Sequence, residues 1–355
     1  MGEAKSAACE LVCEIPGVNI YSDGTVDRST HDQHLPTTPA HPDQALYGAV
    51  SKDVTINSLT GIWVRIYLPQ GAPKHGPQIN GELHEVGGLP IVVYVHGGGF
   101  ILASAASSFA HDICCKMCAK LNVIVVSVDY RLAPEHRLPA AFDDTFAALK
   151  WLQSQATDEA ASEKEPWLAA YGNFGKCFLM GQGSGATIVH QVALRCSTED
   201  MLPLQICGLV MDIPFFGGLD RTDSEIKFGN TYVDGVLQMK LSDDFWAFSL
   251  PIGADRSHPY SDFRSSDAPD LSQFQLPPSL IAVGRLDPCY DREILFVEAL
   301  RRGGQEVRLL DYPGKDHAIY FPEVEGDMEN AYAVYSNFIV TCTNQTSKSI
   351  IKPAF

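Results

Sequence analysis

Residues 176–186 read KCFLMGQGSGA and combine three structural signals in one short stretch. The apolar run KCFLM is typical of a strand that is buried on both faces of a sheet. The glycines that follow suit a tight turn, and the residues from Ala186 onward have the apolar spacing of a helix. A buried strand, a glycine turn and a helix in succession are the repeating unit of an α/β fold.

The same pattern recurs along the chain. Short apolar runs that predict buried strands occupy 89–95, 122–128, 176–180, 207–211, 279–283 and 307–312. Helical spacing separates most of them, over 108–120, 140–155, 186–196, 290–302 and 327–342. The alternating residues 53–68 predict a hairpin. Because strands and helices alternate, we predict one mainly parallel sheet with helices on both faces.

Two segments fall outside this alternation. Residues 1–45 are polar and contain proline, and they predict an irregular segment that lies across the rest of the protein. Residues 213–275 are rich in Phe, Pro, Asp and Ser with little periodicity, which predicts a helical lid over the sheet. We therefore expect a single domain, 1–355, whose small helical cap consists of 1–45 and 213–250.

Charge and composition exclude several classes of protein. The chain has 26 Lys and Arg residues against 43 Asp and Glu residues, a formal charge of −17, which disfavours nucleic acid and anionic membranes as partners. The start of the chain lacks the pattern of a signal peptide, and no apolar run is long enough to span a membrane. The ten cysteines are irregularly spaced, as expected for reduced thiols. We predict a cytoplasmic protein, with a homodimer compatible with these features.

His96-Gly97-Gly98-Gly99-Phe100 follows the predicted strand 89–95. Three consecutive glycines allow the backbone to approach a ligand closely with its N–H groups exposed, which is what stabilising an oxyanion requires. Glycine runs also occur in plain loops, so this motif alone leaves both interpretations open.

The glycine turn itself has the context of a nucleophile elbow, G-x-S-x-G, but its central residue is Gly183. Its neighbour Ser184 lacks the flanking glycines, and we expect its Oγ to point into the protein. A dinucleotide-binding motif belongs in the first strand-helix unit, whereas this one lies in the middle of the chain. Cys114, Cys115 and Cys118 resemble half of a zinc site without a second half. We therefore predict no cofactor and no metal.

Asp287 and His317 each follow a predicted strand, 279–283 and 307–312. Residues just beyond the carboxyl ends of parallel strands line the functional crevice, so both side chains are expected at the same edge as Gly183. The order of elbow, acid and histidine is that of α/β-hydrolases. We predict that Asp287 orients His317, which acts as a general base.

Together these motifs resemble the plant carboxylesterases of the hormone-sensitive-lipase group. The resemblance spans about residues 15–340 and rests on His96–Phe100, Asp129–His136, Leu138–Asp144, the elbow, Asp287 and His317. A weaker similarity, at Pro214–Gly218, Arg221–Thr222 and Phe245–Pro251, is to the subgroup that includes strigolactone-degrading carboxylesterases.

The resemblance implies the α/β-hydrolase fold and a Ser-His-Asp triad. It also implies an oxyanion hole made by the amides of Gly97, Gly98 and Ser184. We further expect Phe100 and Tyr320 to line the substrate pocket. The family substrate would be a small apolar carboxylic ester or lactone.

This chain departs from the family at Gly183, where the nucleophilic serine is expected. Either the serine was replaced deliberately, or the natural protein uses the scaffold without acyl-enzyme chemistry. Hydrolysis by the chain as written should then be very slow. Relatives in the family that act by proton transfer or as receptors provide the alternatives: a lyase, cyclase or dehydratase that uses His317 as base, or a small-molecule receptor.

Overall fold

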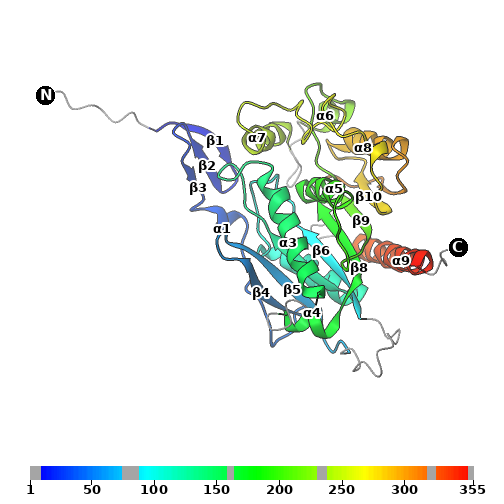
Figure 1. The fold of residues 1–355 in the computed structure, drawn as a ribbon. Helices are drawn as coiled ribbons and strands as arrows, with labels where there is room; N and C mark the ends of the chain where they lie inside the picture. Colours follow the sequence, from blue (N-terminus) through cyan, green and yellow to red (C-terminus); the bar gives the residue numbers. More distant parts are fainter. Residues whose placement is uncertain (1–8, 74–87, 158–163, 230–237, 318–324, 351–355) are drawn as a thin grey trace.

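The computed structural model describes residues 9–73, 88–157, 164–229, 238–317 and 325–350, the last without the side chains of 325–329 and 346–350. Its centre is an eight-stranded sheet in the order β11-β10-β9-β8-β6-β7-β5-β4 (Figure 1). The strands are β4 (Ala49–Asn57), β5 (Ile62–Pro69), β6 (Leu89–Val95), β7 (Ile124–Asp129), β8 (Gly172–Gln182), β9 (Ile206–Asp212), β10 (Ser279–Gly284) and β11 (Val307–Tyr312). Only the pairings of β4 with β5 and of β5 with β7 are antiparallel. The predicted α/β fold with a mainly parallel sheet is confirmed.

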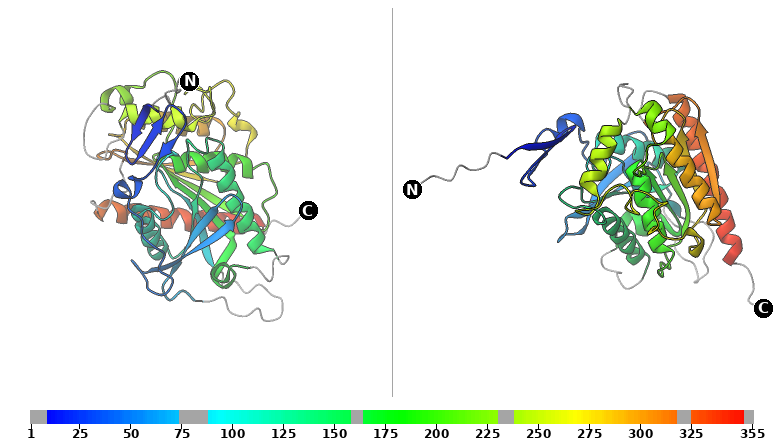
Figure 2. Two further views of the ribbon diagram at one scale, coloured as in Figure 1. Left: turned by 90° about the vertical axis from the view of Figure 1, so that its left-hand side faces the viewer. Right: turned by 90° about the horizontal axis from the view of Figure 1, so that it is seen from above.

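Helices cover both faces of the sheet (Figures 1 and 2). One apolar core contains residues of α3 (Ala140–Ala156), α5 (Ser184–Cys196) and α8 (Tyr290–Arg302). A second core contains residues of α2 (Ser108–Leu121) and α9 (Glu325–Ile350). The short helix α4 (Pro166–Tyr171) precedes β8. This two-sided burial explains why the central strands are apolar throughout.

The prediction of an irregular N-terminal segment is wrong. Residues 9–45 include a three-stranded antiparallel sheet of β1 (Leu11–Ile15), β2 (Val18–Tyr21) and β3 (Val26–Asp27), followed by the short helix α1 (His31–His34). Cys13, Ile15, Val18 and Ile20 are buried, so alternate residues of these strands do face a core. The strands are too short for this alternation to stand out from a polar background.

The described part of 213–250 contains two helices, α6 (Asp223–Phe228) and α7 (Met239–Ser249). Strand β1 packs against α7, so the N-terminal sheet and this region lie side by side. The short helical turn Leu271–Gln273 lies beside α8. Ser184, rather than Ala186, is the first residue of α5, and Asn122 ends α2 in a left-handed conformation instead of beginning β7.

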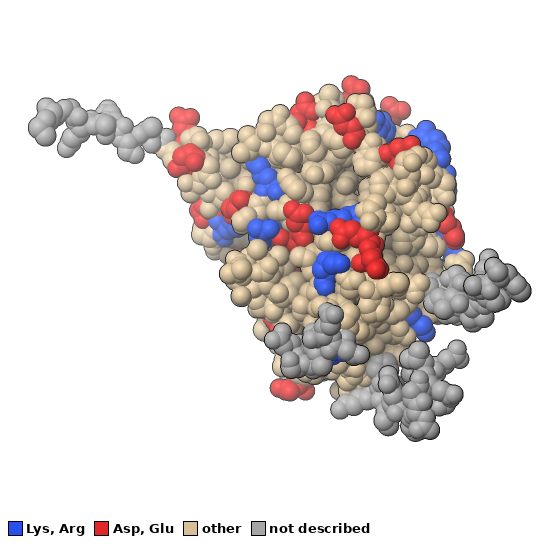
Figure 3. All heavy atoms as spheres, viewed as in Figure 1, with Lys and Arg blue, Asp and Glu red and all other residues tan. Residues whose placement is uncertain are grey.

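Surface charges are mixed on the face shown in Figure 3, where blue and red side chains lie interspersed. Several charged side chains of the protein form ion pairs, as in Arg28 with Glu135 and Arg131 with Asp144. Within the described residues, no helix has the length and hydropathy required to cross a bilayer.

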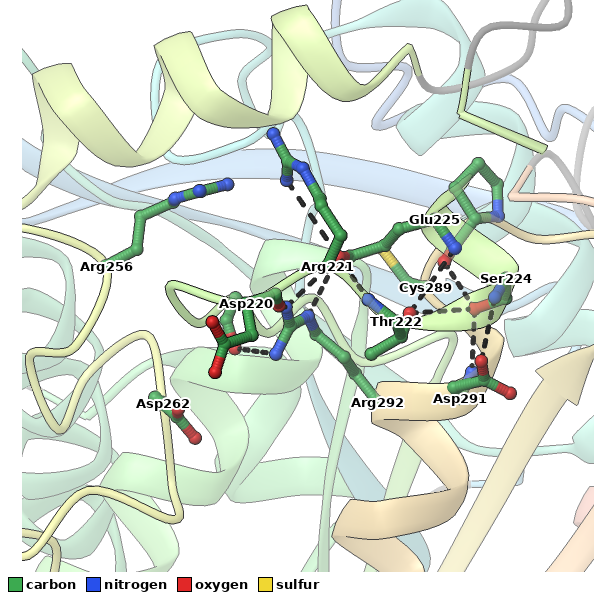
Figure 4. Close-up of polar contacts among 12 residues, drawn as sticks. Asp220, Arg221, Thr222, Ser224, Glu225, Arg256, Asp262, Cys289, Asp291 and Arg292 are labelled. Atoms are coloured by element: carbon green, nitrogen blue, oxygen red, sulfur yellow. Dashed lines mark hydrogen bonds and ion pairs between the residues drawn. The ribbon is translucent and has the colours of Figure 1, made fainter. Parts of the chain in front are cut away.

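A buried ion pair holds α6 against the start of α8 (Figure 4). The Arg292 side chain is 1% exposed and contacts both carboxylate oxygens of Glu225, which is 2% exposed. Arg292 also donates to the carbonyl oxygens of Gly217 and Asp220, each at 2.6 Å. Since every side of the guanidinium meets an acceptor, this one residue anchors the segment 217–225 to the sheet's helical layer.

Removing Glu225 should therefore destabilise the fold strongly. In Glu225→Ala, Arg292 is left buried without its counter-charge, and we expect the free energy of unfolding in urea to fall by about 3–5 kcal/mol. Asp143→Ala breaks an exposed pair with Arg195, and its cost should be below about 1 kcal/mol. Equal losses in the two variants would contradict the anchoring role of Arg292.

Candidate active site

Gly183 occupies the turn between β8 and α5. Its φ of +55° and ψ of −121° are disfavoured for residues with a side chain. Its N–H donates to the Asp212 carbonyl oxygen at 2.9 Å. A Cβ built on Gly183 would approach His317 Nε2 at 3.6 Å, which is ordinary van der Waals contact. The turn therefore directs residue 183 toward His317 and leaves space there.

The two flanking glycines allow no side chain. A Cβ on Gly181 would lie 2.3 Å from the Gly185 carbonyl oxygen, and one on Gly185 would lie 2.1 Å from the Val95 carbonyl oxygen. The strand, turn and helix are thus in direct backbone contact. This is the local arrangement that a nucleophile elbow requires.

His317 and Asp287 are brought together from neighbouring strand ends. Asp287 follows β10 and is fully buried, while the His317 side chain follows β11 and is 18% exposed. Backbone hydrogen bonds, including Leu286 N–H to the Lys315 carbonyl at 2.8 Å, hold the two loops side by side. Asp287 Oδ2 lies 2.6 Å from His317 Nδ1, and Oδ1 accepts from the Cys289 N–H at 2.7 Å.

This pairing sets the protonation of the imidazole. Burial lowers the pKa of His317, but the carboxylate charge of Asp287 and its hydrogen bond raise it by more, so the pKa lies above the usual 6.5. With Nδ1 bonded to Asp287, Nε2 faces the Gly183 turn. The histidine is therefore oriented to exchange a proton at that point.

The loop after β6 borders the same turn. A Cβ on Gly97 would lie 2.8 Å from the Gln182 carbonyl oxygen, and one on Gly98, with φ of +116°, would lie 2.3 Å from the Leu102 carbonyl oxygen. Gly97 and Gly98 line one cavity together with Gly183 and His317. Ser184 Oγ instead accepts from the Phe100 N–H at 3.2 Å and is buried, so its hydroxyl points into the protein.

The cavity at this edge has a volume of about 210 Å³. Apart from Gln182, His317 and the glycines, its wall is apolar, formed by Leu35, Leu102, Ala103, Phe109, Ile113 and Ile213. An apolar wall with a few convergent polar groups is typical of a small-molecule site. We call this space the ligand cavity.

Of the two residues proposed from sequence for the substrate pocket, the structure describes Phe100. Phe100 is 1% exposed, and its ring packs against Phe215 and Trp246 at 6.2 and 5.2 Å between centroids. It does not line the ligand cavity. Tyr320 lies outside the described residues.

The apolar wall was not predicted from sequence. Ile213 directly follows β9, so the rule that strand ends line the crevice could have identified it. Phe109 and Ile113 are four residues apart on α2 and share one face, but nothing in the sequence distinguishes this face from core packing. Leu35 lies in a loop without a local pattern.

In the part of the chain that the structure describes, one cluster has potential metal ligands close together. Atoms of Asp287, Cys289 and His317 lie within 4.8 Å of one another. Burial and the charge of Asp287 raise the pKa of the Cys289 thiol well above its usual range, and a protonated thiol is a poor ligand. The carboxylate of Asp287 is already engaged by His317 and the Cys289 N–H. This group suits a hydrogen-bonded acid and base better than a metal.

This chain is similar in sequence and in fold to known proteins. Residues 92–321 match the family model described as alpha/beta hydrolase fold. The chain is 39% identical to carboxylesterase 20 of Arabidopsis thaliana over 80% of its length and 83% of the relative's. It is 35% identical to 2-hydroxyisoflavanone dehydratase of Glycyrrhiza echinata, over 88% and 92% of the two chains.

A solved structure agrees with these relatives. The thermostable carboxylesterase EstE1, cloned from a metagenomic library, superposes with a TM-score of 0.65 at 25% identity, covering 86% of this chain and 91% of the other. The chain therefore belongs to the plant carboxylesterases of the α/β-hydrolase family.

Proposed function

We propose that this protein binds a small apolar carboxylic ester or lactone in the ligand cavity, with Gly183 in place of the nucleophilic serine. The observation that carries this proposal is the free space beside Gly183. A Cβ built on Gly183 would lie 3.6 Å from His317 Nε2. A serine there would put its hydroxyl beside a base that Asp287 already orients. The amides of Gly97, Gly98 and Ser184 would stabilise the oxyanion.

Without the hydroxyl, no acyl-enzyme can form on residue 183. His317 then remains as a general base for water, and removal of a triad serine typically slows turnover about 10⁶-fold. The chain accordingly hydrolyses its ligand very slowly and holds it for longer. The similarity of Pro214–Gly218 to strigolactone-degrading carboxylesterases favours a lactone among the ligands.

The second candidate function is elimination catalysed by His317. A relative named 2-hydroxyisoflavanone dehydratase is 35% identical across 92% of its length. His317 Nε2 would take a proton from the substrate and return it to the hydroxyl, which leaves as water while backbone amides stabilise the charge on the carbonyl oxygen. This route needs no serine at residue 183. This candidate makes activity of the unmodified chain depend on His317.

Restoring the hydroxyl tests the first function. Gly183→Ser should raise kcat/KM for p-nitrophenyl acetate by at least about 10³-fold, because the triad gains its nucleophile. The positive φ should make this variant about 1–2 kcal/mol less stable in urea.

The matched control is Gly183→Ala, which adds the same Cβ without a hydroxyl and should remain inactive. Serine and alanine variants of equal activity would exclude the restored triad. If the unmodified chain dehydrates a ketone that carries its hydroxyl on the β-carbon, and His317→Ala abolishes this, the elimination function holds instead.

The pH dependence of the Gly183→Ser variant should follow His317. Only the neutral imidazole accepts a proton, so kcat/KM should rise with pH and level off above an apparent pKa higher than 6.5, since Asp287 raises that pKa. In Gly183→Ser/Asp287→Asn the charge is removed and burial dominates, so the apparent pKa should fall and the plateau rate should drop. A pH profile unchanged by Asp287→Asn would contradict this assignment of the base.

A further inference from the structure

A second, much smaller cavity adjoins the ligand cavity and is lined by apolar side chains, including Met117 and Met180, and by several polar ones. Its volume of about 10 Å³ corresponds to roughly one water-sized group. Its polar lining consists of Tyr94, Asp212, Tyr332 and Tyr335, together with Gln182. Ile113 and Gln182 line both cavities and so form the wall between them.

Two of these polar groups have unused hydrogen-bonding capacity. Tyr335 Oη donates to Asp212 Oδ1 at 2.9 Å. Among the described residues, the hydroxyls of Tyr94 and Tyr332 have no hydrogen-bond partner, although Tyr94 is 1% and Tyr332 is 7% exposed. A buried hydroxyl without a partner costs about 1–3 kcal/mol, so two of them facing one small cavity are a strong sign of a site that accepts a polar group.

The cavity is uncharged at neutral pH. Burial raises the pKa of Asp212 to about 8, and the hydrogen bond from Tyr335 lowers it only partly. No Lys or Arg is among the described residues that line the cavity. Protonated Asp212 and the two phenols can each donate and accept, which suits a neutral hydroxyl better than an anion.

The position of Asp212 connects this cavity to the site. Asp212 is the last residue of β9, and its carbonyl oxygen accepts the N–H of Gly183 at 2.9 Å. Its partner in the neighbouring strand is Gln182, the residue before the turn. The small cavity therefore lies directly behind the turn on which the proposed function depends.

We propose that Asp212, Tyr94 and Tyr332 form a subsite for one neutral hydroxyl group of the ligand. The subsite rests on the proposed function, because the ligand that carries the hydroxyl is the ester or lactone held in the ligand cavity. Ile113 and Gln182 line both cavities, so the hydroxyl would reach the subsite past these two side chains. The ligand is thus an apolar ester or lactone with an alcohol or phenol at the end remote from the reacting carbonyl.

The test uses the Gly183→Ser chain and pairs of p-nitrophenyl esters with acyl chains of four to eight carbons, with and without a terminal hydroxyl. For the chain length that reaches the subsite, the ratio of kcat/KM for the hydroxylated and plain esters should fall about fivefold in Tyr94→Phe and in Tyr332→Phe. This corresponds to loss of one neutral hydrogen bond. Both variants keep the ring, so packing is preserved.

Tyr67→Phe is the matched control. Tyr67 is also fully buried, but its hydroxyl contacts His111 Nδ1 at 3.1 Å and does not line either cavity. In Tyr67→Phe, the ratio of kcat/KM for the hydroxylated and plain esters should be unchanged. Ratios that are unchanged in all three variants, or reduced equally in all three, would overturn the subsite.

A terminal amine in place of the hydroxyl separates a cation site from a hydroxyl site. If Asp212→Asn lowers kcat/KM for the amino ester more than for the hydroxy ester, the subsite binds cations and the proposal is wrong.

If Gly183→Ser hydrolyses no ester, the proposed function has failed. The subsite is then tested by calorimetric titration of the unmodified chain with methyl 6-hydroxyhexanoate and methyl hexanoate. A preference for the hydroxy ester that Tyr94→Phe removes supports it, and any other result overturns it.

Discussion

The direct backbone contact between β6, β8 and α5 is the constraint on which the site depends. A Cβ on Gly185 would lie 2.1 Å from the Val95 carbonyl oxygen, and a Cβ on Gly181 would lie 2.3 Å from the Gly185 carbonyl oxygen. The glycine loop after β6 is held just as closely, since Gly97 abuts the Gln182 carbonyl. Main-chain atoms alone therefore position the turn and the amides beside it, whatever side chain residue 183 carries.

The acid and the base are held by a second, independent set of contacts. Asp287 precedes α8, whose Arg292 is buried against Glu225 and two carbonyl groups. Hydrogen bonds between the β10 and β11 loops then set the place of His317. Because neither set of contacts uses the side chain at residue 183, a chain with glycine there retains the geometry of the His317–Asp287 pair. Glycine at this position is therefore compatible with an intact fold.

The central sheet and its helices could be predicted because buried strands and amphipathic helices leave strong periodic signals. Asp287 and His317 could be predicted for a related reason: each comes just after such a strand. The small N-terminal sheet could not, since its first two strands have only five and four residues and apolar side chains also stand at exposed positions such as Val12. For Phe100, the sequence indicates the position along the chain but not the direction of the side chain. Its place after the glycines indicates proximity to the site, but only packing against Trp246 and Phe215 determines that its ring faces the core.

The environment of the Asp212 carboxyl could not be predicted from the sequence. In the run CGLVMD it is the polar end of a buried strand, a position that usually faces solvent or a ligand at the sheet edge. Here it is 1% exposed, and its carboxyl is neutral at pH 7 because burial raises its pKa to about 8. Asp287 instead contacts His317 Nδ1 at 2.6 Å. A neutral interior favours neutral ligands, and the described residues that line the ligand cavity include no Lys or Arg to balance the carboxylate released by ester hydrolysis. In the proposed function this difference favours binding of the ester and release of the acid, so loss of the nucleophile converts a site suited to turnover into one suited to retention.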